Sequence, residues 1–221
     1  MPREARFIEP EIPYHVTQRG NYQQNVFHED QDRHKYLELL NVHSLKNKLE
    51  VWAYCLMDNH IHLIVYPRES QSLAKALATT HMMYAQYCHR QSGVVGHFWQ
   101  GRFYSCALDA QHLVHATRYV EMNPVRARLV ETPTDWVWSS ARYHLGVCDD
   151  PLLDQARWPD EELLYDWKAV LEVYDDDASI QRLRYATRTG HPMGSNTWIK
   201  ALEQRSGRRL HPLPVGRPRK R

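Results

Sequence analysis

The chain has 221 residues, of which 43% are hydrophobic, and its formal net charge is +2. This length fits one domain, with or without an appendage, and is sufficient to bury a substantial core. No apolar run approaches the roughly 18 residues of a membrane span, and the charged start "MPREARFIEP" lacks the apolar stretch of a secretory signal. The four scattered cysteines form no CxxC pair, which favours reduced thiols over a disulfide scaffold or a zinc finger.

The first half of the chain shows clear strand and helix patterns. A strand is predicted in "IPYHVTQRGN", ending at Gly20, and a helix from about 30 to 48. Two runs of β-forming residues, "EVWAYCLM" and "HIHLIVYP", are joined by Asp58 and Asn59 and predict a hairpin. The clearest helix covers 72–91, where apolar side chains recur at helical spacing.

The next elements complete a recognisable order. A fourth strand is predicted near 102–107, and Asp109 is placed to cap a helix that runs to about Met122. The order β-α-β-β-α-β-α is that of the split βαβ plan. We therefore predict an α+β fold, a ferredoxin-like split βαβ sheet with helices on one face. An additional C-terminal helical region and a basic tail follow it.

Charge and composition divide the chain into three predicted parts. These are a main domain (1–146), an acidic helical segment (147–189) and a C-terminal helix with a basic tail (190–221). Residues 205–221 hold seven Lys and Arg and no acid, whereas 149–177 hold eleven acids against two basic residues. A basic tail is typical of a nucleic-acid-binding arm, although a solvated tail and a solvated helix face explain the same charges.

The stretch "MDNHIHLIVYP" places His60 and His62 inside an apolar strand. Residues two apart on a strand face the same side, so the two histidines share one face with Ile64. The aliphatic residues between them should face the covering helices, which leaves the histidines on the open face. Two rings at this spacing can bind one metal ion. A solvated face explains an isolated HxH pattern as well, because the chain has fourteen histidines.

The stretch "HATRYVEMNPVRARLV" adds a phenol and an amide. Tyr119 and Asn123 are four apart and are therefore neighbours on a helix surface. Pro124 disfavours the helical conformation at Asn123, so a helix break is expected there. If this helix lies near the open face, these groups and the histidine pair form one site. Otherwise Tyr119 is one of thirteen tyrosines and simply packs.

Four segments in this order resemble a known family: "YHVTQRGN", "NHIHLIV", "FWQGRFYS" and "RYVEMNPVRARLV". They resemble the Y1 tyrosine transposases of the IS200-like HUH superfamily, and more narrowly the REP-associated tyrosine transposases of bacteria. The segment "GHPMGSNTWIKALEQRSGRRL" and the later "GRPRK" are similar to the C-terminal region of that subgroup. The resemblance covers nearly the whole chain and is weakest across 147–185.

The resemblance implies a role for each of four residues. His60 and His62 would bind a divalent ion, Tyr119 would be the nucleophile, and Asn123 would be the third metal ligand, where relatives carry glutamine. Phosphate chemistry favours Mg²⁺ or Mn²⁺ as the ion. Attack by the phenol would form a 5′-phosphotyrosine, so that rejoining needs no ATP. A phenol has an ordinary pKa near 10, so a cation or base must assist, and His115 is a candidate.

The resemblance also implies a partner, since the family acts on single-stranded DNA hairpins recognised with a short guide sequence. The candidate DNA contacts are Arg19, Asn21, Arg102, Arg126, Arg128, Arg217, Arg219 and Lys220. Phe98 and Trp99 either stack on unpaired bases or belong to the core. The "GRPRK" end resembles an AT-hook core, but a flexible phosphate-binding arm fits as well. We expect a cytoplasmic, nucleoid-associated protein that acts as a monomer or a homodimer.

Three functions stay open at this point. The favoured one is a metal-dependent single-strand DNA endonuclease and strand transferase. The second is a domesticated hairpin-binding protein on the same fold without transposition activity, which a nicking assay would separate from the first. The third is a metal-dependent hydrolase of small molecules, which would form no covalent protein–DNA species.

Overall fold

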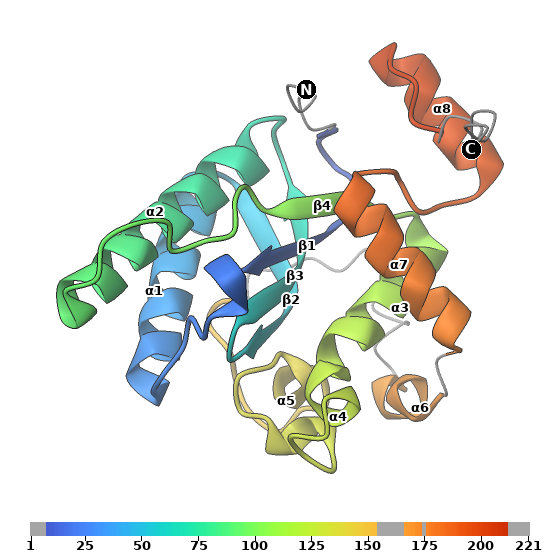
Figure 1. Ribbon diagram of the computed structural model, residues 1–221. Coiled ribbons are helices and arrows are strands. Elements are labelled where there is room, and N and C mark those ends of the chain that lie inside the picture. The colour runs from blue at the N-terminus through green and yellow to red at the C-terminus, as the bar shows by residue number, and fades with distance from the viewer. Residues whose placement is uncertain (1–7, 154–165, 174–175, 212–221) are drawn as a thin grey trace, which may run out of the picture.

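The computed structural model describes residues 8–153, 166–173 and 176–211 (Figure 1). The strands are β1 (Tyr14–Arg19), β2 (Leu49–Met57), β3 (His60–Pro67) and β4 (Tyr104–Ala107). The α-helices are α1 (Asp30–Lys46), α2 (Ser72–Ser92), α3 (Ala110–Glu121), α4 (Asn123–Arg126), α5 (Ala141–His144), α6 (Trp167–Glu172), α7 (Asp177–Thr189) and α8 (Asn196–Ser206). Two short 3₁₀ turns are η1 (Asn21–Gln23) and η2 (Pro133–Asp135).

The four strands form one antiparallel sheet in the order β2-β3-β1-β4. β2 and β3 are joined by the two-residue turn at Asp58 and Asn59, which confirms the predicted hairpin. β1 lies in the centre, where Thr17 is opposite His62 on β3 and Tyr104 on β4. This order of strands is that of the split βαβ plan. The predicted α+β class and the ferredoxin-like sheet are therefore confirmed.

Helices cover both faces of this sheet (Figure 1). α1 and α2 lie on one face, as expected, while α3 and α7 lie on the other. The face that carries the histidines was expected to be open, and that expectation is wrong. The face is covered because α3 and α7 each have an apolar side that must be buried. These sides include Leu113, Val120 and Leu183, which pack against the sheet. As a result His62 is only 5% exposed.

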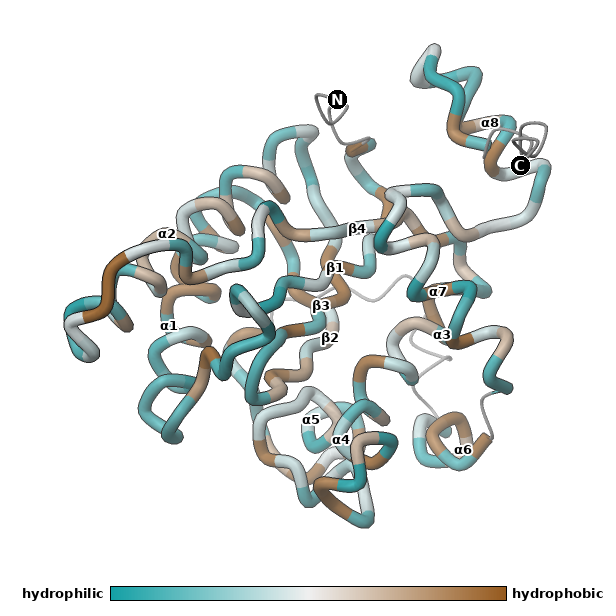
Figure 2. The backbone as a smooth tube through the Cα atoms, viewed as in Figure 1, coloured by the Kyte–Doolittle hydropathy of each residue, from teal (hydrophilic) through white to brown (hydrophobic). Residues whose placement is uncertain are grey.

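The sheet therefore separates two apolar clusters. The larger lies against α1 and α2 and includes Ile61, Leu63 and Val65, which alternate along β3. The smaller lies against α3 and α7 and includes Ile64 from the opposite side of the same strand. In Figure 2 the strands accordingly carry hydrophobic and hydrophilic segments in close succession. The alternation predicted from the sequence thus assigns each residue of β3 to the correct face.

The helix that carries the predicted nucleophile begins and ends at the predicted places. Asp109 caps α3 by accepting a hydrogen bond from the backbone N–H of His112 at 2.9 Å. The helix ends at Glu121, and a new turn, α4, starts at Asn123 with Pro124 in its first turn. Proline is tolerated there because the first N–H groups of a helix have no intrahelical partner. The break at Asn123 is confirmed.

A buried carboxylate anchors the end of α3. Glu121 is fully buried and accepts hydrogen bonds from Ser140 Oγ at 2.5 Å, His144 Nδ1 at 2.6 Å and Trp167 Nε1 at 2.6 Å. These donors come from the residue before α5, from α5 itself and from α6. Three donors compensate the cost of burying this carboxylate. Trp167 belongs to the predicted acidic segment, so its bond to Glu121 joins that segment to the end of α3.

The C-terminal part contributes α7 and α8. Ser195 caps α8 by accepting from the backbone N–H of Trp198 at 3.2 Å. α7 belongs to the predicted segment 147–189 but packs on β4 of the main sheet. The basic tail with Arg217, Arg219 and Lys220 lies outside the described residues. None of the helices in the described ranges has the length and apolarity that a membrane span requires.

Candidate functional site

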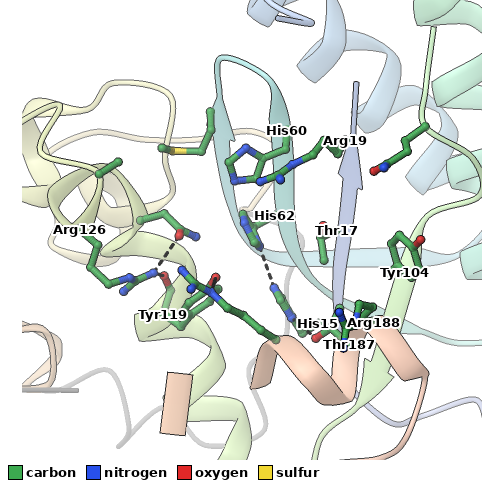
Figure 3. A pocket seen from close by; sticks show the side chains of 15 residues that line it. His15, Thr17, Arg19, His60, His62, Tyr104, Tyr119, Arg126, Thr187 and Arg188 are labelled. Atoms are coloured by element: carbon green, nitrogen blue, oxygen red, sulfur yellow. Dashed lines mark hydrogen bonds between the residues drawn. The ribbon is translucent and has the colours of Figure 1, made fainter. Parts of the chain in front are cut away.

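The two histidines of β3 are joined by a third that the sequence did not single out. His15 on the neighbouring strand β1 stacks on His62, with ring centroids 5.2 Å apart and an angle of 6° between the ring planes. His60 lies on the other side of His62, at a centroid distance of 4.9 Å. The three rings form a row across β1 and β3 (Figure 3).

Burial keeps these imidazoles neutral. It lowers the pKa of His60 to about 4, and the nearby Arg19 and Arg184 act in the same direction. The pKa of His62 is held well below its ordinary value by burial and then by the neighbouring histidines and Arg126. Burial also lowers the pKa of His15 to about 3. Neutral rings are the form in which imidazole binds a metal.

A hydrogen bond identifies the nitrogen of His60 that carries the proton. Its Nδ1 lies 2.6 Å from the side-chain oxygen of Asn59 in the hairpin turn. An amide oxygen only accepts, so Nδ1 carries the hydrogen and Nε2 keeps its electron pair. The turn therefore holds the ring of His60 and leaves its Nε2 with an electron pair that could bind an ion.

Tyr119 lies beside this row of rings. Its side chain is buried, and its ring centroid is 5.5 Å from that of His62 and 5.8 Å from that of His15. The Nε of Arg184 on α7 donates to the phenol oxygen at 3.2 Å. The guanidinium carbon of Arg126 lies 4.2 Å from the ring centroid on its face. The helix thus places the phenol next to the histidine pair, and two cations contact it.

Asn123 is brought to the same place. It is 7% exposed, and its side-chain oxygen accepts from Arg126 Nη2 at 2.8 Å. Its side-chain nitrogen is buried, and no hydrogen-bond partner for it lies within the described residues. Because one electron pair of the oxygen is already engaged, Asn123 fits a metal less completely than the two imidazoles do.

The donor set decides how well a divalent ion fits. Within the described ranges no group of three or more His, Cys, Asp or Glu side chains is arranged to hold a metal. An ion would therefore depend on His60, His62 and the neutral amide of Asn123. Neutral donors leave the charge of the ion almost undiminished, so that its remaining positions favour water and phosphate oxygens. The residues fit a divalent ion that is completed by a phosphate.

These side chains line one cavity of about 520 Å³ between the sheet, α3, α4 and α7 (Figure 3). Its lining comprises His15, Thr17, Arg19, Met57, His60, His62, Gln100, Tyr104, Tyr119, Asn123, Arg126, Ala127, Arg184, Thr187 and Arg188. Four of these residues are arginines and none is acidic. Such a lining attracts an anion as large as a nucleic-acid phosphate.

The other predicted DNA contacts are distributed more widely. Arg19 lines the cavity at the end of β1, and Arg126 lines it while its guanidinium turns back to Tyr119 and Asn123. Arg128 lies beside a neighbouring cavity, which Arg126 and Arg184 also line. Arg102 is exposed before β4, and Asn21 lies in η1. Neither is among the residues that line the histidine cavity.

Two further expectations concern Phe98 and Trp99 as base-stacking or core residues and His115 as a base near the phenol. Phe98 is buried and Trp99 packs partly buried against the same core, so the core alternative holds for both. His115 is exposed and lines a separate cavity of about 240 Å³ on the far side of Tyr119. The phenol oxygen accepts a hydrogen bond from Arg184.

The sequence reasoning missed the contribution of α7. This helix provides Arg184, Thr187 and Arg188 to the cavity. The local signals were present: Asp176 caps the helix, Gly190 ends it in a left-handed conformation, and Ile180 and Leu183 follow helical spacing. These signals predict a helix, but not that it returns to the sheet.

Comparisons with known proteins identify one family model and two solved structures that the chain resembles. The family model described as "Transposase IS200 like" matches residues 9–123. A solved structure of a REP-associated tyrosine transposase bound to a REP hairpin is 18% identical, with a TM-score of 0.53, over 69% of this chain and 96% of that one. A candidate transposase from Deinococcus radiodurans R1 is 20% identical, with a TM-score of 0.38, over 54% of this chain and 96% of that one. No curated protein matches the sequence significantly.

Proposed function

Because the chain belongs to the IS200-like transposase family, we propose that it cleaves and rejoins single-stranded DNA through a 5′-phosphotyrosine on Tyr119. The observation that carries the proposal is the phenol of Tyr119 beside two neutral imidazoles, in a cavity lined by arginines and free of acids. A cavity built for a small neutral substrate has no need of four arginines.

The residues of the chain divide the work as follows. The phenol oxygen of Tyr119 attacks the phosphorus, and the bond from phosphorus to the 3′ oxygen of the preceding nucleotide breaks. The phenol gives its proton to water, the 3′ oxygen takes a proton from water and leaves as a hydroxyl, and the 5′ phosphate stays bound to the tyrosine. Arg184 donates to the phenol oxygen and thereby stabilises negative charge as the phenol loses its proton. The reverse attack by a 3′ hydroxyl restores the phosphodiester without ATP.

His60, His62 and Asn123 would hold the divalent ion, for which Mg²⁺ or Mn²⁺ is proposed. When bound, the ion supplies Lewis-acid stabilisation of the phosphate. The histidines contribute by staying neutral and by presenting electron pairs in fixed directions. Arg19 and Arg188 add positive charge at the rim, which orients the DNA backbone.

The proposed substrate is a single strand folded into a REP-like hairpin, recognised with a short guide sequence. The solved relative on the same fold is bound to a REP hairpin, and the sequence motifs resemble that subgroup. One chain alone brings Tyr119 next to His62, so the proposal needs no second copy to supply the nucleophile. The tail with Arg217, Arg219 and Lys220 is proposed to bind the DNA backbone, within a nucleoid-associated role.

The test is the covalent intermediate. The probe is a pool of single-stranded oligonucleotides with a fixed hairpin stem and randomised flanking bases, incubated with Mn²⁺. We expect an adduct stable in detergent, mapped to Tyr119 by mass spectrometry. Tyr119→Phe should reduce adduct yield at least about 10³-fold while hairpin binding persists, since only the nucleophile is removed.

The matched comparison is Tyr104→Phe, because Tyr104 lines the same cavity from β4. An adduct that survives Tyr119→Phe and disappears in Tyr104→Phe would identify Tyr104 as the nucleophile. A wild-type protein that binds hairpins and never forms an adduct would favour the domesticated hairpin-binding protein.

A further inference from the structure

A chain of hydrogen bonds connects α7 to the histidine pair. The hydroxyl of Thr187 lies 2.8 Å from the backbone oxygen of Leu183 and 2.7 Å from Nδ1 of His15. A carbonyl oxygen only accepts, so the single hydroxyl hydrogen belongs to the bond with Leu183. The remaining electron pairs of Thr187 must accept. His15 therefore donates from Nδ1.

The second link follows from the first. A neutral imidazole carries one N–H, so Nε2 of His15 holds an electron pair. Nδ1 of His62 lies 3.0 Å from that nitrogen and must donate to it. The hydrogen of His62 is then on Nδ1, and its Nε2 keeps the electron pair that a metal requires. The dashed line in Figure 3 between His15 and His62 marks this bond.

Burial removes water as an alternative partner for these groups. His15, Thr187 and His62 are 1%, 2% and 5% exposed, so water is not available to replace a lost partner. The thiol of Cys106 lies 3.3 Å from the hydroxyl of Thr187 and stays protonated, because burial raises its pKa to about 12. Cys106 therefore occupies the second electron pair of Thr187 as a donor. Every polar atom in this chain of hydrogen bonds is thus assigned as a donor or an acceptor.

We propose that His15 and Thr187 are positioning residues that hold the hydrogen of His62 on Nδ1 and so reserve its Nε2 for the divalent ion. His15 acts directly and Thr187 acts through it. Without the hydroxyl of Thr187, His15 can carry its hydrogen on Nε2 and donate to His62. The hydrogen of His62 then moves to Nε2 and blocks the ion. The inference rests on the proposed function only for the divalent ion.

The experiment replaces the hydroxyl of Thr187 by a methyl group of equal size. Thr187→Val should weaken Mn²⁺ binding to the metal-free protein about 10–100-fold, measured by electron paramagnetic resonance titration without DNA. Thr187→Ser keeps the hydroxyl, so its Mn²⁺ affinity should stay within about 3-fold of the wild type, a much smaller change than that of Thr187→Val. Thr189→Val is the matched control, since Thr189 on the same helix is exposed and its hydroxyl bonds to backbone oxygens of α7. Mn²⁺ binding by Thr187→Val at wild-type affinity overturns the proposal.

A second measurement decides the matter even if Thr187→Val does not fold. Nitrogen–proton correlation spectra of the metal-free wild-type protein report which ring nitrogen carries the hydrogen. We expect Nδ1–H for both His15 and His62. A hydrogen on Nε2 of His62 contradicts the proposal directly. Neither measurement involves DNA or Tyr119, so a failure of the nucleophile assignment and a failure of this inference are separate results.

Discussion

The face of the sheet under α1 and α2 and the face under α3 and α7 take alternate residues from the same strand. On β3, Ile61 and Leu63 enter the first face, while His60 and His62 enter the second. The first face is a continuous apolar core. The second combines a smaller core with a polar cavity lined by four arginines. The difference shows that one face supplies most of the burial, so the other can hold groups that are costly to bury.

The largest expected effect comes from a pair of neighbouring substitutions on β3. His60→Ala should reduce cleavage by at least about 10³-fold, because a bound ion contributes several kcal/mol to the transition state. Its unfolding free energy should change little. Leu63→Ala should instead cost about 2–5 kcal/mol of unfolding free energy and leave cleavage per folded molecule intact.

Adduct assays and urea unfolding of both variants measure these two effects, and EDTA treatment of the wild type should reproduce the His60→Ala loss. Cleavage at the normal rate in EDTA would remove the metal from the proposal. A large loss of unfolding free energy in His60→Ala with normal specific activity would show that His60 stabilises the fold and has no role in cleavage.

A smaller effect is expected on α7, which belongs to the second face alone. Arg184→Gln removes a charged hydrogen bond to the phenol oxygen, worth about 1.5–3 kcal/mol, and should slow adduct formation about 10–100-fold. Arg182→Gln on the same helix is the matched control, because Arg182 is exposed and donates to Ser179. Single-turnover rates at saturating DNA give the comparison. Equal rates for the two variants would mean that Arg184 has no part in the chemistry.

The smallest effect is the contribution of His60 to the pH dependence of the unfolding free energy. His60 has a pKa of about 4 in the folded protein, against about 6.5 in an unfolded chain. Between these values the unfolded state binds a proton that the folded state does not, so stability decreases as pH falls through this window. We expect a contribution of about 1 kcal/mol, after allowance for the partial exposure of His60.

Urea unfolding of the metal-free protein at pH 7.5 and 5.0 measures it. His60→Gln should show a shallower loss, whereas Leu63→Ala should keep the wild-type slope. A wild-type slope in His60→Gln as well would show that other groups govern acid sensitivity.

Local sequence pattern was sufficient for most of the fold and for part of the site. The period of two along β3 and the turn at Asp58 and Asn59 determine which face His60 and His62 take, and both are properties of adjacent residues. Pro124 likewise determines the helix break at Asn123 without reference to the rest of the molecule. The placement of Tyr119 near the histidines followed from the resemblance and from an assumed position of α3.

The missed parts share one physical cause, which is that their contacts join distant segments. Thr187 and His15 are 172 residues apart, and Arg184 and Tyr119 are 65 apart. Helical spacing in α7 shows that one side must be buried, but not against which surface. The open face was predicted because no signal within a single element states that a later helix returns to cover it.

The carboxylate of Glu121, two positions after Tyr119, has a consequence for the proposed strand exchange. Bonds from Ser140, His144 and Trp167 immobilise the end of α3 from several directions. A swing of the tyrosine towards a second site would break all three and leave a charge stranded in the interior. Under the proposed mechanism the backbone that carries Tyr119 is held in place by these bonds, so strand exchange would require the cleaved DNA ends to move relative to the tyrosine.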